Sequence, residues 1–490
     1  MVDRRREEMA SATGQEFPLD DNATIGNGGG QLAKSSGLYP VTQARGCTSM
    51  DIPDRSSFAP SSAVDSTYNY DLLLELSEAL LAYGTPSHRI EALVHTLGTA
   101  LSVPVTVHYL PTFTILDFEA TSVPAGRKSH HIIKTRGGWD FGKLQRLHKL
   151  VKNVIRSGAA VDPHEARIEL KAIKATADDW SELWIVGAYP LSAATSAIMF
   201  FHGDGGDALA SGLLAIIPAL MRLLANRYPA FWWTYEIITC ALVSVIASSI
   251  SSTSCYSSLL LSSVVTLLPG YTVTAAVVEV LTKNVVAGAA RLCYVAVHLA
   301  AMAYGLTLAP ILYNAAMGNG FDRRPLNSEQ ACATEQNIAV SHYWLFLCVP
   351  VYIVSYNIYL KAPFRQWIVM SAVGALGYFA GYLCKRVWHS PPEVNAFVAA
   401  LCIGVTANAY SRWKDDLGFN AITAGVFIQV PGSWGLRGML ALAYQEYDRA
   451  LYWNYSMLAI CVGISGALLM SNVIVFGPRL KNRGVPLTDF

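Results

Sequence analysis

Two Pro-Gly pairs inside long apolar segments are the residues whose type and spacing point most directly to chemistry. Pro269-Gly270 and Pro431-Gly432 lie 162 residues apart, each well inside a segment long enough to cross a membrane. Proline removes a backbone donor and clashes with the carbonyl group one turn earlier, so each helix is predicted to break there. In hydrocarbon, unsatisfied backbone groups are costly, which favours a break that faces protein or a water-filled cavity.

Breaks at matching depths in two segments indicate a binding site for a small solute. The half-helix that begins after each break has free N–H groups and a partial positive charge, which suit a carboxylate. Polar and aromatic side chains beside the breaks would complete the pocket. The candidate binding residues are Pro269, Gly270, Tyr271, Thr272, Thr274, Pro431, Gly432, Ser433 and Trp434. A proline kink that serves only helix packing is the alternative.

Three ionisable residues are candidates for coupling or gating: Glu236, Glu279 and Arg291. Glu279 lies nine residues beyond Gly270, about 13 Å along a helix, which is too far to touch a solute held at the break. It could instead relay protons from the cytoplasmic side. A structural ion pair between Glu279 and Arg291 explains the same two residues equally well. His298 is either a proton carrier or a core histidine.

The elements that must hold these residues follow from the charge distribution. Of the 490 residues, 52% are hydrophobic and 14% are charged. Residues 1–182 contain 41 charged side chains, about 23%, which is near the ~25% of soluble domains, whereas residues 183–478 contain 26, about 9%. The second part has too few charges for a water-exposed surface. A net charge of +1 argues against a nucleic-acid-binding protein.

The low-charge part is predicted to contain ten membrane-spanning helices, because a span needs about 20 mostly apolar residues. Lysine and arginine are retained in cytoplasmic loops. Eleven basic residues against six place both termini in the cytoplasm. The sequence does not distinguish the plasma membrane from the vacuolar membrane. The predicted spans are residues 183–201, 207–225, 231–250, 258–278, 292–313, 343–360, 366–384, 394–410, 417–436 and 451–478.

The spans are predicted to form two inverted repeats. Subtracting 162 from the sixth span gives the first span, so each half has five spans. Five is odd, so the second half must cross the membrane in the opposite sense, as in many secondary transporters. The predicted division is a disordered polar tail at 1–66, a cytoplasmic α/β domain at 67–182, repeats at 183–313 and 342–478, an exoplasmic loop at 314–341 and a cytoplasmic tail at 479–490.

The 67–182 segment has the pattern of a small soluble α/β domain. Helical spacing in residues 71–83 ends at Gly84, and a second helix begins near Thr85 or Ser87, either of which could cap it. Strands are predicted at 103–109, 113–118 and 130–135, followed by an amphipathic helix at 144–155 and a helix opened by Asp162-Pro163. His130, His131 and His164 could act as bases, but no partner lies at a diagnostic spacing, which favours structural histidines.

No cofactor or metal site is expected. The nine cysteines lie mostly in apolar runs without paired spacing, which is typical of small buried side chains and not of a disulfide framework or a zinc site. No G-x-x-x-x-G-K-[ST] loop occurs, which argues against direct ATP drive. The first residues lack the apolar core of a secretory signal, so the first span is expected to direct the chain to the membrane.

Several ordered motifs resemble the threonine/serine exporter (ThrE) family, and within it the fungal pheromone-regulated membrane proteins. The similar stretches are residues 81–91, residues 267–270, Glu279, Gly288, Arg291, residues 407–412 and residues 430–433. The resemblance covers residues 67 to about 480. It implies a cytoplasmic domain followed by ten spans, and proton-driven export of small hydroxylated amino acids. The long polar N-terminus departs from the bacterial pattern and suits the fungal branch.

The leading hypothesis is therefore a secondary transporter, not an enzyme, whose partners are an amino acid, protons and the lipid bilayer. Threonine or serine would leave the cytoplasm against inward proton flow. The alternatives are a membrane-anchored hydrolase in which residues 67–182 are catalytic, and a membrane organiser or receptor that transports nothing. A homo-oligomer is compatible with the sequence.

Overall fold

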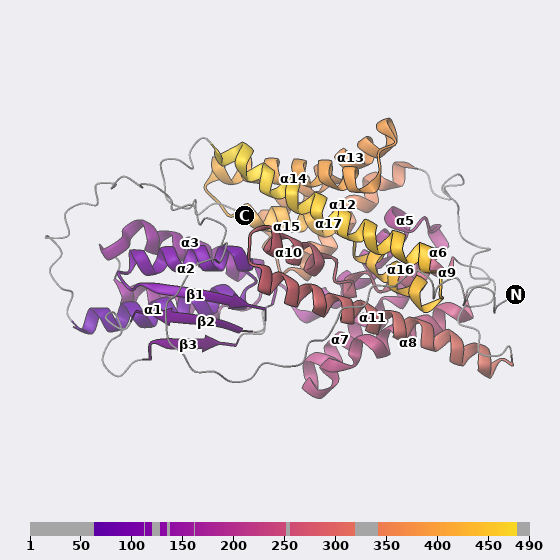
Figure 1. Ribbon diagram of the computed structural model, residues 1–490, viewed down its shortest axis with the longest axis horizontal. Helices are drawn as coiled ribbons and strands as arrows, with labels where there is room; N and C mark the ends of the chain where they lie inside the picture. Colours follow the sequence, from indigo (N-terminus) through magenta and orange to yellow (C-terminus); the bar gives the residue numbers. More distant parts are fainter. Residues whose placement is uncertain are drawn as a thin grey trace, which may run out of the picture. The chain divides into compact units, whose positions relative to one another are not determined.

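The N-terminal part of the described chain combines four helices with one antiparallel sheet (Figure 1). The computed structural model describes residues 63–111, 113–119, 128–134, 138–160, 162–250, 255–318 and 342–477. We call residues 63–175 the N-terminal region. Its elements are α1 (Ala63–Ala82), α2 (Ser87–Ala100), β1 (Val105–Leu110), β2 (Phe113–Phe118), β3 (His130–Ile133), α3 (Phe141–Ser157) and α4 (Pro163–Ala175).

The sheet has the order β1-β2-β3, and Val105 pairs with Phe118 at one end of the first hairpin. Alternate residues of β2 are buried, as expected for a strand with one covered face. The core beneath that face includes Leu73, Leu116 and Val151 from three different elements. All five apolar residues that the sequence placed on one face of α3 are buried, namely Leu144, Leu147, Leu150, Val151 and Val154. The three predicted strands and this amphipathic helix are confirmed.

Of the two helix N-caps that the sequence predicts in this region, the structure confirms one. The Asp162 carboxylate accepts a hydrogen bond from the His164 N–H at 2.9 Å, with Pro163 in the first turn. The expected cap of α2 by Thr85 or Ser87 is wrong. Pro86 occupies the N-cap position, so no side chain there accepts from the first turn.

His148 on α3 makes this region sensitive to acid. Burial, together with the positive charges of Arg89 and Lys152, lowers the pKa of His148 to about 3, although Asp415 and Asp416 oppose the shift. Between about pH 6.5 and pH 3 the unfolded chain binds a proton here that the folded chain does not, so stability falls as pH falls. From pH 7 to pH 5 we expect a loss of about 2 kcal/mol.

Hydrogen-exchange protection of α3 amides, measured on the full chain at both pH values, checks this expectation. His148→Gln should remove most of the loss, because glutamine does not titrate. His95→Gln, at an exposed position of α2, is the matched control and should retain it. An unchanged pH dependence in His148→Gln would contradict the assignment.

The rest of the described chain is helical and largely apolar. Its helices are α5 (Glu182–Phe200), α6 (Gly205–Leu214), α7 (Ile216–Arg227), α8 (Tyr235–Ser249), α9 (Tyr256–Ser263), α10 (Gly270–Leu281), α11 (Val285–Ala316), α12 (Leu345–Tyr359), α13 (Phe364–Trp388), α14 (Pro392–Lys414), α15 (Phe419–Gln429), α16 (Gly432–Ala443) and α17 (Tyr447–Phe476). Each predicted apolar segment coincides with one or two of these helices, with ends that differ by up to seven residues.

Six helical segments in the described residues are long and apolar enough to cross a membrane, or seven if one bent pair is a single span. The six are α5, α6 with α7, α11, α13, α14 and α17, and the bent pair is α9 with the segment from Val265 to Leu281. The protein is therefore a polytopic helical membrane protein. α8 and α12 have only 15 residues each, so the count of ten spans stays a prediction.

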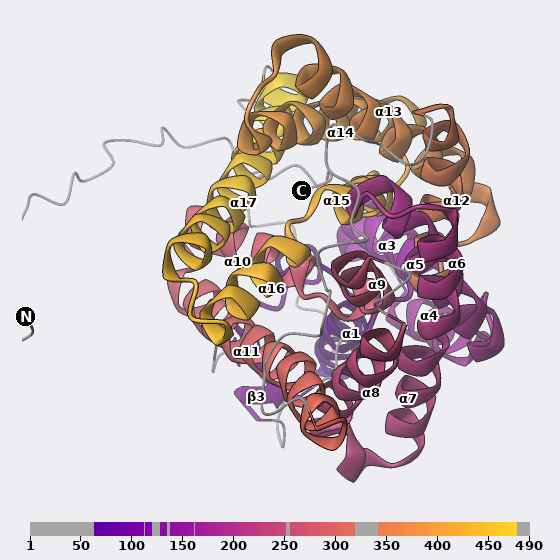
Figure 2. The same cartoon turned by 90° about the vertical axis from the view of Figure 1, so that its right-hand side faces the viewer.

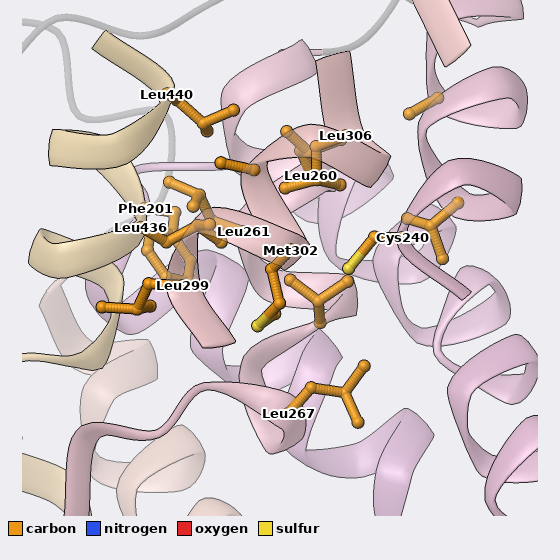
Figure 3. Packing of buried hydrophobic residues seen from close by; sticks show 14 of the residues in the cluster. Phe201, Cys240, Leu260, Leu261, Leu267, Leu299, Met302, Leu306, Leu436 and Leu440 are labelled. Atoms are coloured by element: carbon orange, nitrogen blue, oxygen red, sulfur yellow. The ribbon is translucent and has the colours of Figure 1, made fainter. Parts of the chain in front are cut away.

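Two of the short helices lie inside an arc of long ones (Figure 2). Figure 2 shows α9 and α16 inside an arc that includes α11, α17, α14 and α13. α11 packs on α8 and α10, and α17 packs on α14 and α16. A buried apolar cluster joins α9 and α11 to α16, where Leu436 and Leu440 lie near Leu260, Leu299 and Met302 (Figure 3).

The N-terminal region contacts the ends of several apolar helices. The Phe141 N–H donates to the Leu360 carbonyl oxygen at 3.1 Å just after α12. Gln145 donates to the Asp416 carboxylate at 3.0 Å after α14. Lys152 and Arg156 of α3 pair with Asp415, and their hydrogen bonds, that of Lys152 first, lower the pKa of the Asp415 carboxyl. These contacts fix the region against two helix-helix loops.

One of the described cysteines departs from the expected pattern of unpaired side chains. Cys255, just before α9, is disulfide-bonded, whereas Cys240, Cys293, Cys348, Cys384, Cys402 and Cys461 are free. Spacing could not reveal the bond, because a disulfide needs proximity in space and not in sequence.

Three predicted segments lie largely outside the described residues: the tail at 1–66, the loop at 314–341 and the tail at 479–490. The described parts of the first two segments are helical, since α1 begins at Ala63 and α11 continues to Ala316.

Candidate functional site

The two Pro-Gly pairs stand at the starts of two helices. After α9 and a 3-10 turn at Val265–Leu267, the chain passes Pro269 and α10 begins at Gly270. After α15, the chain passes Pro431 and α16 begins at Gly432. Both prolines are N-cap residues with nearly the same backbone angles, φ −80° and ψ 33° for Pro269 and φ −87° and ψ 41° for Pro431. Each apolar segment is interrupted where the sequence predicted a break.

The two helix starts touch each other. A Cβ atom built on Gly270 would lie 2.8 Å from the Gly432 backbone nitrogen. A Cβ atom built on Gly432 would lie 2.9 Å from the Leu268 Cβ and 3.0 Å from the Gly270 nitrogen. These distances are shorter than ordinary contacts, so glycine is required at both positions for the backbones to approach this closely.

A cavity of about 850 Å³ lies at this meeting point. Eight of the nine candidate binding residues line it: Pro269, Gly270, Tyr271, Thr272, Pro431, Gly432, Ser433 and Trp434. Thr274 does not. It is buried one turn further along α10, where its hydroxyl donates to the Gly270 carbonyl oxygen at 3.2 Å. Thr274 instead lines the second, smaller cavity described below.

Two arginines in the cavity wall were missed as site residues. Arg222 of α7 and Arg437 of α16 line the cavity, whereas the sequence placed Arg222 near the end of the span 207–225 and Arg437 in the loop after the span 417–436. The Arg437 guanidinium lies 5.0 Å from the Trp453 ring centroid and 5.6 Å from that of Phe201. Cations over aromatic faces are stabilised, and they stay available to an anion. The available signal was the position of Arg437 five residues after Gly432.

An acid-histidine pair also lines this cavity. His298 Nδ1 lies 2.9 Å from Glu236 Oε2, and His298 Nε2 lies 3.4 Å from the Leu267 carbonyl oxygen. The sequence singled out Glu236 and His298 separately. Only the packing of α8 against α11 brings them together. A carboxylate and an imidazole at this distance can share and pass a proton.

Glu279 and Arg291 form the ion pair that the sequence left open. Arg291 contacts both carboxylate oxygens of Glu279, at 2.8 and 3.1 Å, and Glu279 is 1% exposed. Arg291 also donates to the Tyr109 hydroxyl of β1 at 2.8 Å. Burial raises the pKa of Tyr109 although Arg291 opposes the shift, so the hydroxyl is neutral at physiological pH. This triad lines a second cavity, of about 330 Å³.

Among the other polar residues, Asn395 and Gln429 also line the first cavity, whereas Asn408 and His130 lie elsewhere. Asn408 donates to Ser471 and Asn472 of α17, a bond between helices. His130 pairs with Asp117 on the sheet, and both side chains are largely exposed. Within the part of the chain that the structure describes, no cluster of three His, Cys, Asp or Glu side chains is arranged to hold a metal ion.

Two family models match this chain on either side of the 319–341 segment. One, described as "Putative threonine/serine exporter", matches residues 71–313, and the other, described as "Threonine/Serine exporter, ThrE", matches residues 345–474. The chain belongs to the threonine/serine exporter family. The first match runs from within α1 nearly to the end of α11, and the second runs from the start of α12 nearly to the end of α17.

Relatives of this exporter-family chain occur in fungi. Pheromone-regulated membrane protein 10 of Pichia sorbitophila is 25% identical over 432 residues, which are 83% of this chain and 42% of the relative. The protein of the same name in Eremothecium gossypii is 24% identical over 443 residues, 86% and 58% of the two chains. An uncharacterized protein of Schizosaccharomyces pombe is 26% identical over 434 residues, 83% and 56%. The chain spans about half the length of these curated relatives. No solved structure matches it.

Proposed function

We propose that this protein is a secondary transporter that exports a small zwitterionic amino acid such as threonine or serine. The observation that carries the proposal is the meeting of two helix N-termini, at Gly270 and Gly432, on one cavity of about 850 Å³. Broken helices whose half-helix starts face a shared cavity are a recurring design for substrate sites in secondary transporters. Membership of the exporter family supports the same substrate class.

Both charges of a zwitterion have suitable partners in this cavity. The N–H groups at the starts of α10 and α16, with the guanidinium of Arg437, would bind the carboxylate. The carbonyl ends of α15 and of the turn at Val265–Leu267, with the aromatic faces of the wall, would bind the ammonium group. Thr272 and Ser433 offer hydroxyls to the side chain of the solute.

We further propose ten spans in two inverted five-span repeats, 183–313 and 342–478. The 162-residue offset supports this proposal. Helices α10 and α16 begin 162 residues apart, at Gly270 and Gly432, and helices α11 and α17 also begin 162 residues apart, at Val285 and Tyr447. It also relates two residues with positive φ, Lys283 and Gln445. In addition, α10 packs on α17 as α16 packs on α11.

The proposed orientation has both termini and a soluble domain at 67–182 in the cytoplasm. The loops after α12 and after α14, which the basic residues assign to the cytoplasm, are the ones that contact the N-terminal region. Cys255, directly before α9, is disulfide-bonded. Disulfides persist in oxidising compartments, which supports a non-cytoplasmic location for this loop.

Proteoliposomes containing the full chain test the transport proposal. We expect saturable flux of labelled threonine that an imposed pH gradient accelerates and that unlabelled serine reduces by competition. Flux that neither saturates nor responds to the pH gradient would contradict the transport proposal. Turnover of ester or amide substrates by the same preparation would instead favour a membrane-anchored hydrolase.

We propose Glu236 and His298 as the proton carriers, with Glu279 and Arg291 as gating residues. Glu236→Gln is expected to reduce gradient-driven flux to the level measured without a gradient, because glutamine cannot take up a proton. Threonine exchange at equal pH on both sides should continue. Glu446→Gln removes a carboxylate that pairs with Arg449 and serves as the control. Full gradient stimulation in Glu236→Gln would exclude this carboxylate as the carrier.

A further inference from the structure

Three aromatic rings stand between the two cavities. Trp139 and Tyr271 line both of them. Phe427 stacks on Tyr271 with ring centroids 5.0 Å apart and planes 10° apart. The Trp139 ring meets both of these rings edge-on, at centroid distances of 5.0 Å from Tyr271 and 6.0 Å from Phe427. The three rings are therefore in continuous contact at the boundary between the two cavities, beside Thr272, which also lines both.

Each ring comes from a different part of the chain. Tyr271 is the second residue of α10, immediately after the first break, and Phe427 lies in the last turn of α15, immediately before the second break. Trp139 lies in the N-terminal region, just before α3. A shift of either break must therefore move one ring against the other two.

Backbone contacts on both sides of Trp139 fix its position, one within the N-terminal region and one to the loop after α12. The Gly138 N–H donates to the Ala82 carbonyl oxygen at 3.1 Å, and the Phe141 N–H donates to the Leu360 carbonyl oxygen at 3.1 Å. Gly84, with φ of +90°, lies so close that a Cβ atom there would be 2.8 Å from the Gly138 carbonyl oxygen and 3.1 Å from Trp139 Cε3. Only glycine fits this conformation and this approach. The indole is thus placed by three neighbouring segments.

The second cavity is polar enough to admit a hydrated solute. It lies between the N-terminal region and α10, and its wall includes the Glu279–Arg291 pair and the Tyr109 hydroxyl. Among the described residues, the buried Thr85 hydroxyl in the same wall has no hydrogen-bond partner. Such a group would gain a partner from water or a small polar solute.

We infer that Trp139, Tyr271 and Phe427 form the inner gate of the transport path, and that the second cavity is the vestibule by which a zwitterion enters the first. This inference rests on the proposed function. It gives the N-terminal region a direct part in transport, because that region supplies one ring of the gate and one wall of the vestibule. The vestibule offers a carboxylate and a guanidinium close together, which suits a zwitterion that is losing its water.

Thiol accessibility tests the gate without any assumption about the solute. Ser433 lines only the first of the two cavities, so a cysteine there reports entry past the rings. In a Cys293→Ser background, which removes an exposed native thiol, Ser433→Cys is treated with a small charged methanethiosulfonate from the side of the N-terminal region. Adding Trp139→Ala should speed its modification about tenfold or more, because two aromatic pairs are lost. Trp139→Phe should give an intermediate rate.

Trp184→Ala, which removes an exposed tryptophan of α5, is the matched control and should leave the rate unchanged. If Trp139→Ala does not yield folded protein by size-exclusion chromatography, Phe427→Ala tests the same three-ring contact. An unchanged rate in a folded gate variant would overturn the inference. Threonine flux is measured on the same proteins: absent flux in the wild type refutes the proposed function, whereas the accessibility result stands separately.

Discussion

Gly270→Ala is expected to lower solute flux at subsaturating threonine about tenfold or more while leaving folded protein in the membrane. The added methyl group would lie 2.8 Å from the Gly432 nitrogen and from Val430 Cγ2, so the two helix starts must move apart. Overpacking of this kind costs about 1–3 kcal/mol. If that cost falls on solute binding, affinity drops about tenfold or more. Uptake of labelled threonine into proteoliposomes, compared at equal protein amounts, measures the effect.

Gly432→Ala should have the same effect, because its Cβ would meet Leu268 and Gly270 from the opposite side. Gly466→Ala in α17 is the matched control, since a Cβ there meets nothing within 4 Å. Wild-type KM and maximal flux in both Gly270→Ala and Gly432→Ala would show that close approach of the two breaks is not needed for transport.

Arg291→Leu is expected to lower the free energy of unfolding by about 3–5 kcal/mol, because it leaves the buried Glu279 carboxylate without its cation. Thermal unfolding of the full chain in detergent, followed by the fraction that remains monodisperse, measures the loss. The geometry behind this size is the two-point contact of one guanidinium with both carboxylate oxygens.

The double variant Glu279→Gln with Arg291→Gln should recover most of that stability, because no unpaired charge is left. Tyr109→Phe removes only the hydrogen bond that Arg291 donates to the phenol, and should cost about 1 kcal/mol. A stable Arg291→Leu protein would mean that water reaches Glu279 in the folded state. In that case water from the second cavity, and not Arg291 alone, stabilises the carboxylate.

The breaks themselves could be predicted, because their cause is local. Proline cannot donate a backbone hydrogen bond, and this holds in any surroundings. The same is true of the apolar segments, the three strands and the cap at Asp162, whose patterns are written in neighbouring residues. The cap at Thr85 failed for a local reason too, since Pro86 took the position instead.

Other features depend on residues that are far apart in the chain. The charge of Arg437 predicts a position between spans. In the structure, α16 continues past Arg437, and the residue lines the cavity. Trp139 gave no signal of a role in transport, since its neighbours in space are on α10 and α15. The disulfide at Cys255 had no sequence pattern either.

By itself, the sequence determined the membrane character of the chain, the two breaks and the resemblance to exporters, because hydrophobicity and proline act within a few residues of themselves. The tertiary structure alone decided that the breaks touch, that Glu236 meets His298 and that Trp139 meets two other rings at the boundary between two cavities. Each of these depends on how helices pack, and packing is set by the combined shape of many side chains. No single motif contains that information.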